Sequence, residues 1–167
     1  VARSGAMSFG TVTAWLRGVP ALGFSMVGGL AGAIEYIEPF KRIRAVVEQP
    51  GVRFLVISSD VIYPPGALRA YQRKFWLPFK GVTKPVFAIP GNHDWYDALE
   101  GFAATFYTPE AARIAMKARI ASDLHLSTTT DAKVEGYLTE TQRLRDLYHV
   151  PTGFQQAPFF QVRCGDF

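Results

Sequence analysis

Residues 54–63 (FLVISSDVIY) and residues 85–96 (PVFAIPGNHDWY) decide the fold of this 167-residue chain. Each stretch contains a short, continuous apolar run that is bounded by turn residues. Runs of this length with β-branched and aromatic side chains favour strands buried on both faces of a sheet. Both stretches are therefore predicted to be strands of a sheet, and polar residues follow each of them.

The segment between the two stretches predicts a helix. Residues 67–79 carry Leu68, Tyr71, Phe75 and Phe79 at helical spacing, after a Pro-Pro-Gly break. Strand, helix and strand in this order form a βαβ unit, whose strands are parallel and whose crossover is right-handed. The fold class is therefore predicted to be α/β.

Further elements are predicted on both sides of this unit. Helices are expected at residues 35–48, 109–120 and 131–148, the second of them capped by Thr108, and a strand is expected at residues 159–164. Residues 35–167 are assigned to one domain. Because the chain starts without Met and stops just after a predicted strand, we expect it to be part of a longer protein.

Residues 1–34 form a separate, glycine-rich and apolar segment with no acidic residue. Its uncharged part, residues 18–34, contains five glycines and a proline. It is shorter than the ~18–20 apolar residues that a membrane span needs. A buried or loosely ordered segment is the first interpretation, and membrane contact or an unfolded end are the alternatives.

Composition excludes several classes of protein. With 49% apolar and 19% charged residues, the chain can bury a core and is not intrinsically disordered. A single cysteine, Cys164, excludes a disulfide framework and multi-cysteine metal sites, and it fits a reducing compartment such as the cytoplasm. The net charge of +4 is mild, and the basic residues form no single patch, so no specific nucleic-acid partner is predicted.

Polar residues with metal-binding chemistry follow both predicted strands. Asp60 comes after the first strand, and Asn92, His93 and Asp94 come after the second. The carboxyl ends of parallel strands share one edge of the sheet, where ligands bind in open α/β folds. Carboxylate, amide oxygen and imidazole suit divalent Mn, Fe, Zn or Mg. The alternatives are a helix cap at Asp60 and a simple turn at residues 91–94.

In order and spacing, residues 54–63 and 85–96 closely resemble the calcineurin-like metallophosphoesterases. In that family one strand ends in Gly-Asp and the next in Gly-Asn-His-Asp or Gly-Asn-His-Glu. The resemblance covers residues 52–102. It implies a partial metallophosphoesterase-type α/β sandwich with a parallel βαβ core and a divalent metal pair. It also implies hydrolysis of a phosphate-ester substrate by metal-bound hydroxide.

The resemblance also implies roles for individual residues. Asp60 matches the aspartate that bridges two metals, and Asn92 matches the asparagine that ligates one metal. His93 matches the histidine that contacts the phosphate or protonates the leaving group, and Asp94 would accept a hydrogen bond from it and set its tautomer. Tyr63 matches a tyrosine that ligates iron in purple acid phosphatases; the alternative is a ring packed beside the following proline.

The chain also departs from the family pattern. Ser59 stands where a glycine is expected, and residues 1–59 contain neither Asp nor His, so the upstream Asp-x-His motif is missing. His125 and His149 do not follow glycine. The sequence from Asp123 to His125 spells Asp-x-His, but in the wrong order along the chain, and we interpret it as coincidence.

These departures leave a second and a third hypothesis. The second is a degenerate, non-catalytic member of the fold that serves as a binding module. The third is a nuclease, because nucleases share this fold. Since only two or three of about seven family ligands are present, we expect these 167 residues alone to be a poor phosphatase.

Overall fold

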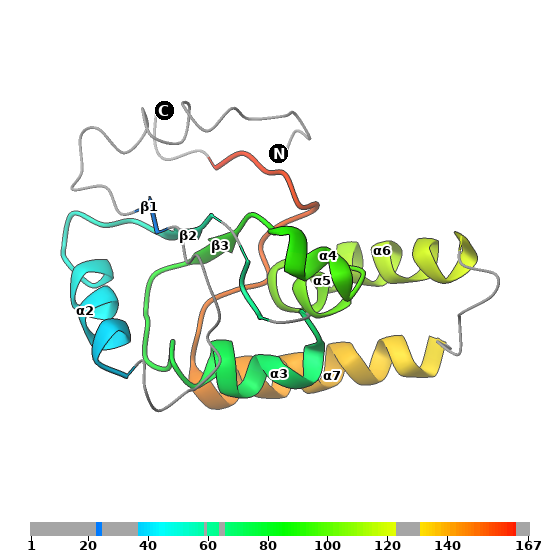
Figure 1. Ribbon diagram of the computed structural model, residues 1–167, viewed down its shortest axis with the longest axis horizontal. Helices are drawn as coiled ribbons and strands as arrows, with labels where there is room; N and C mark the ends of the chain where they lie inside the picture. Colours follow the sequence, from blue (N-terminus) through cyan, green and yellow to red (C-terminus); the bar gives the residue numbers. More distant parts are fainter. Residues whose placement is uncertain (1–22, 25–36, 59, 64–65, 123–130, 163–167) are drawn as a thin grey trace.

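The computed structural model describes residues 23–24, 37–58, 60–63, 66–122 and 131–162 (Figure 1). Its strands form one parallel sheet in the order β1-β2-β3, with β1 at Gly23–Phe24, β2 at Leu55–Ile57 and β3 at Val86–Ala88. Leu55 pairs with Val86 and Ile57 pairs with Ala88. The chain is thus an α/β protein, and the two predicted strands are parallel neighbours.

The crossover between β2 and β3 is helical, as expected, but it is not a regular α-helix throughout. It begins as α3 (Leu68–Tyr71) and continues as a π-helical turn, η1 (Gln72–Trp76), closed by a 3.0 Å hydrogen bond from Leu77 N–H to the Gln72 carbonyl. A π-turn adds a residue to the turn. Consequently Phe75 and Trp76, which are consecutive, are both fully buried.

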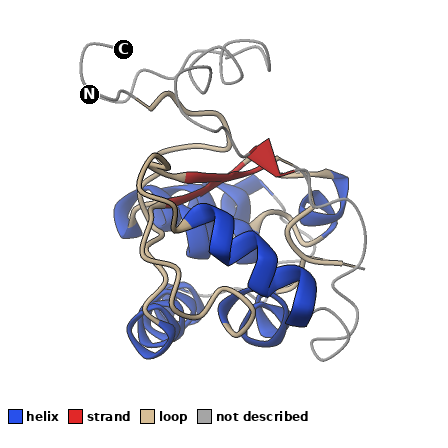
Figure 2. Ribbon diagram, turned by 90° about the vertical axis from the view of Figure 1, so that its left-hand side faces the viewer, coloured by secondary structure: helices blue, strands red, loops and turns tan. Residues whose placement is uncertain are grey.

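Five further helices complete the described part of the chain. They are α2 (Ile37–Val47), α4 (Asn92–Tyr96), α5 (Glu100–Phe106), α6 (Pro109–Ser122) and α7 (Asp131–Tyr148). The predictions of α2, α6 and α7 are confirmed, and Thr108 Oγ1 accepts the Ala111 N–H at 3.3 Å as the cap of α6. The helices α4 and α5 were not predicted. In Figure 1, α2, α3 and α7 lie below the sheet and α4, α5 and α6 lie to its right; in Figure 2 most helices lie below the strands.

Aromatic side chains fill the core between the crossover helix and α5. Phe75 contacts the ring of Phe106 at 5.2 Å between centroids, and Phe102 contacts Phe106 at 4.9 Å. Phe75 also lies 5.0 Å from Phe79. Large buried rings contribute most of the apolar area in such a core. They pack α5 against the crossover helix of the βαβ unit.

The predicted strand at residues 159–164 is wrong for residues 159–162, which form no strand; residues 163 and 164 lie outside the described part. The free edge of β3 is instead covered by a side chain. Gln155 accepts the Ala88 N–H at 2.8 Å and donates to the Ala88 carbonyl at 3.0 Å. The apolar alternation that suggested a strand has another origin: Phe160 stacks on Phe87 at 5.2 Å, whereas Phe159 is 57% exposed.

Of the N-terminal segment 1–34, only Gly23–Phe24 is described, and its backbone pairs with β2. The remainder of that segment, Ser59, Asp123 and His125 lie outside the described residues. None of the helices in the described ranges is long and apolar enough to cross a membrane.

Candidate functional site

Parallel pairing of β2 and β3 brings the two polar loops to one edge of the sheet. The pairing continues one step past the strands, because Ile89 N–H donates to the Ile57 carbonyl at 2.7 Å. Asp60 follows three residues after β2, and Asn92 opens α4 four residues after β3. The loops are therefore held side by side, as the sequence predicted.

Asp60 is bound directly to the start of α4. Its Oδ1 atom accepts the backbone N–H of His93 at 3.0 Å. The acceptor for such an N–H is usually the side chain of the N-cap residue itself. The N-cap of α4 is Gly91, which has no side chain. A Cβ on Gly91 would lie 1.9 Å from Asp60 Oδ1 and 2.4 Å from its backbone nitrogen. Asp60 thus caps α4 from the neighbouring loop and requires glycine at position 91.

Asp94 connects the loop after β2 to the loop after β3 through hydrogen bonds. It is 1% exposed, and its Oδ2 accepts the N–H groups of Val61 at 3.0 Å and Gly91 at 3.1 Å. Its Oδ1 accepts the N–H of Ile62 at 3.4 Å. These bonds make Asp94 the residue that fixes the separation of the two loops. The predicted hydrogen bond from the His93 ring to Asp94 stays a prediction.

Two side-chain oxygens at this edge accept no hydrogen bond from the described residues: Oδ2 of Asp60 and Oδ1 of Asn92. Asn92 donates its Nδ2–H to the Tyr96 hydroxyl at 3.1 Å, which turns the amide oxygen away from that partner. Asp60 is partly exposed and Asn92 is exposed. A carboxylate oxygen and an amide oxygen in adjacent loops are ligands suited to a hard divalent cation.

The side chain of His93 lies between two tyrosines. The Tyr63 ring is 3.6 Å from the imidazole, centroid to centroid, at an interplanar angle of 32°. The Tyr96 ring meets the imidazole edge-on, at 4.9 Å and 71°. The Lys74 ammonium donates to the carbonyl of Tyr63. The proline after Tyr63 lies outside the described residues, so both the ring packed beside that proline and the iron-ligand role of Tyr63 stay predictions.

The structure brings together all four predicted site residues, and Tyr63 with them. Sequence reasoning did not predict the hydrogen bond between Asn92 and Tyr96, which follows from i,i+4 spacing once α4 is known to be a helix. In the described ranges, no three His, Cys, Asp or Glu side chains lie close enough together to hold a metal ion. His149 ends α7 in a left-handed conformation, with φ of 54°.

Burial changes the acidity of Asp94. Desolvation raises the pKa of its carboxyl from 3.8 to about 6; the three backbone N–H groups oppose the rise, and the charge of Asp60 adds to it. The folded chain therefore holds this proton more tightly than the unfolded chain does. The resulting stabilisation is complete below pH 4 and is lost as the pH rises through 6.

We accordingly expect the unfolding free energy of the metal-free chain to fall between pH 4 and pH 7. A shift of this size corresponds to about 3 kcal/mol. Urea denaturation across this pH range should show the fall, and Asp94→Asn should flatten it because an amide does not titrate. Asp131→Asn, an exposed acid on α7, serves as the control and should leave the wild-type slope intact. A slope unchanged in Asp94→Asn would refute this assignment.

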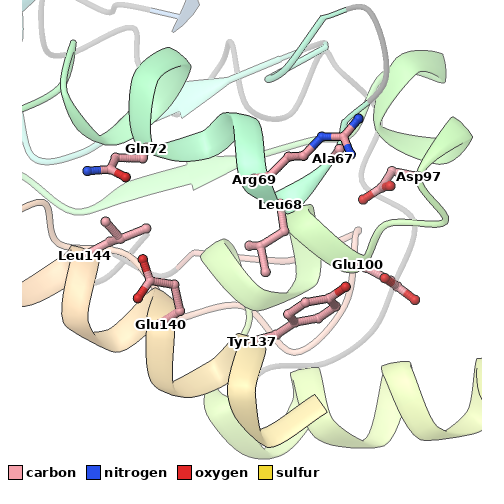
Figure 3. Close-up of a pocket in the computed structure, with 9 residues that line it drawn as sticks. All are labelled: Ala67, Leu68, Arg69, Gln72, Asp97, Glu100, Tyr137, Glu140 and Leu144. Carbon is pink, nitrogen blue, oxygen red and sulfur yellow. The ribbon is translucent and has the colours of Figure 1, made fainter. Parts of the chain in front are cut away.

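A separate pocket of about 420 Å³ lies between the crossover helix, α5 and α7 (Figure 3). It is lined by Ala67, Leu68, Arg69, Gln72, Asp97, Glu100, Tyr137, Glu140 and Leu144. None of the four predicted site residues lines it. Its three carboxylates outnumber its single guanidinium, so this pocket would repel an anionic phosphate ester.

Comparison with models of known protein families, with curated proteins and with solved structures found no match.

Proposed function

We propose that this chain carries part of the active site of a metal-dependent phosphoesterase of the calcineurin-like type. One observation carries the proposal: Asp60 and Asn92, each with a side-chain oxygen that accepts no hydrogen bond from the described residues, lie beside His93 at the carboxyl edge of a parallel βαβ unit. The resemblance of the two sequence motifs supports the same proposal. The α/β sandwich of that family is part of the same proposal.

The proposed site holds one divalent cation. Asp60 Oδ2 and Asn92 Oδ1 would hold it, and an ion such as Mg²⁺ or Mn²⁺ accepts few protein ligands because water and substrate phosphate complete its coordination. The second ion implied by the resemblance needs further histidines and carboxylates. The described residues do not gather them at this edge. Low turnover by this chain alone follows from that shortage.

The residues of the chain would have separate roles in hydrolysis of the ester. A divalent cation supplies charge for a phosphoryl oxygen and lowers the pKa of a water molecule. Asp60 and Asn92 would bind the cation, and His93 would donate a proton to the leaving oxygen of the ester. Asp94 holds the backbone of both loops, so it would fix the distance between Asp60 and His93.

A binding module without catalysis is the second candidate, and a specific observation favours it. Asp60 and Asp94 both have structural roles, because Asp60 caps α4 and Asp94 accepts three backbone N–H groups. Both residues would therefore be needed even in a chain that turns over no substrate. Cation binding without hydrolysis of any phosphate ester would favour the binding module over the phosphoesterase.

Asp60→Asn is expected to weaken Mn²⁺ binding by at least about tenfold, because an amide removes the negative charge while it keeps an acceptor for His93 N–H. Isothermal titration calorimetry with MnCl₂ measures the change, and hydrolysis of an aryl phosphate ester is followed in parallel. Asp146→Asn, on the exposed side of α7, should bind Mn²⁺ as the wild type does. Equal affinity in Asp60→Asn would remove Asp60 from the site.

A further inference from the structure

Both tyrosines beside His93 are themselves held in place. Tyr63 is anchored through its carbonyl, which accepts the ammonium of Lys74 from the π-helical turn. Tyr96 is anchored through its hydroxyl, which accepts the amide N–H of Asn92. The imidazole therefore lies between two rings whose positions are set by separate parts of the fold.

The two contacts constrain different motions of the imidazole. The tilted ring of Tyr63, at 3.6 Å and 32°, packs against one face of the imidazole and limits rotation toward that side. The edge-on ring of Tyr96, at 4.9 Å, limits movement along helix α4. Tyr96 is 67% exposed, so Tyr63, which is partly buried, provides the firmer support.

We propose that Tyr63 is a positioning residue for His93, acting through the face of its ring and not through its hydroxyl. This inference rests on the proposed function, in which His93 gives a proton to the leaving oxygen. General acid catalysis needs the donor within hydrogen-bond distance of that oxygen, and a misplacement of about 1 Å costs up to about 10²-fold in rate. A ring that fixes the imidazole supplies this placement before substrate arrives.

The proposal differs from the metal-ligand role that the sequence resemblance implies for Tyr63. A ligand acts through its phenolic oxygen, whereas the contact with His93 uses the ring. Tyr63→Phe keeps the ring and removes the oxygen. Tyr63→Leu removes both and leaves an apolar side chain. The pair of variants therefore separates the two roles.

The experiment measures Mn²⁺-dependent hydrolysis of an aryl phosphate ester by the wild type and by both variants. We expect Tyr63→Leu to lower kcat by about tenfold or more with KM little changed, and Tyr63→Phe to restore it to within about twofold. Tyr137→Leu, a half-buried tyrosine on α7, is the matched control and should retain wild-type turnover. Unchanged kcat in Tyr63→Leu would overturn the proposal, and equal losses in both variants would assign the role to the hydroxyl.

A second measurement is independent of turnover. The ring protons of His93, followed by NMR, should show an upfield ring-current shift in the wild type and in Tyr63→Phe, and should lose it in Tyr63→Leu. A shift that persists in Tyr63→Leu would overturn the stacked arrangement. If the wild type neither binds Mn²⁺ through Asp60 nor shows Mn²⁺-dependent hydrolysis, the proposed function fails, and the proton shifts still show whether Tyr63 holds the ring.

Discussion

Gly91→Ala is expected to lower the unfolding free energy by about 3 kcal/mol, at the upper end of what overpacking usually costs. The added Cβ would lie 1.9 Å from Asp60 Oδ1 and 2.4 Å from the backbone nitrogen of Asp60. A carboxylate can rotate away, but the backbone of the neighbouring loop must shift. The shift would also break the hydrogen bond from His93 N–H that caps α4.

Gly136→Ala is the matched control, because a Cβ at that position in α7 meets nothing within 4 Å. Alanine is the better helix former, so this variant should gain about 0.5–1 kcal/mol. Urea denaturation of both variants tests whether Gly91→Ala lowers the unfolding free energy and Gly136→Ala raises it. A Gly91→Ala chain as stable as the wild type would show that Asp60 does not lie against this glycine.

His93→Ala is expected to lower turnover of an aryl phosphate ester by about 10²–10⁴-fold, the usual loss when a general acid is removed. Mn²⁺ binding should persist, because His93 contacts Asp60 through its backbone N–H, which alanine retains. The variant thus separates proton donation from metal binding.

His149→Ala is the control for this loss, since His149 is exposed at the end of α7. Its turnover should equal that of the wild type. Turnover of His93→Ala within twofold of the wild type would remove His93 from the chemistry. Loss of Mn²⁺ binding in the same variant would instead make its imidazole a ligand.

The parallel βαβ unit could be predicted because its signals are local. Continuous apolar runs at residues 54–57 and 86–89 can be satisfied only by burial on both faces, and the helix between them has a clear apolar stripe. Thr108 and Pro109 likewise predicted the N-terminal cap of α6, and the apolar spacing predicted the full extent of α7.

Features that depend on contacts between distant residues could not be predicted. The edge of β3 is paired by the side chain of Gln155, 67 residues after Ala88, and nothing in the local pattern marks that glutamine. The π-turn in which Phe75 and Trp76 are both buried is likewise not marked by the local apolar spacing. Residues 159–162 have the apolar alternation that is typical of a strand. In the structure they form no strand, and Phe160 instead stacks on the ring of Phe87.

At the candidate site, the sequence predicted which residues to consider and offered a helix cap as the alternative role of Asp60, but it did not predict which helix Asp60 caps. The motif pattern singled out Asp60, Asn92, His93 and Asp94. It could not show that Asp60 caps α4, because Gly91 and Asp60 are 31 positions apart and meet only through strand pairing. The proposed metal-binding role of Asp60 is compatible with its capping role, because one carboxylate oxygen accepts the His93 N–H and the other accepts no hydrogen bond from the described residues.

The most direct test of the metal site is to titrate Mn²⁺ into the ¹⁵N-labelled chain and map which backbone amide signals broaden first. The account predicts broadening centred on Val61 and His93, beside the open oxygens of Asp60 and Asn92, and its loss in Asp60→Asn. The contradictory result is broadening centred on Glu100 and Glu140, in the acidic pocket of Figure 3, with the His93 amide unaffected. That outcome would place the cation in the pocket and leave the two loops without a metal.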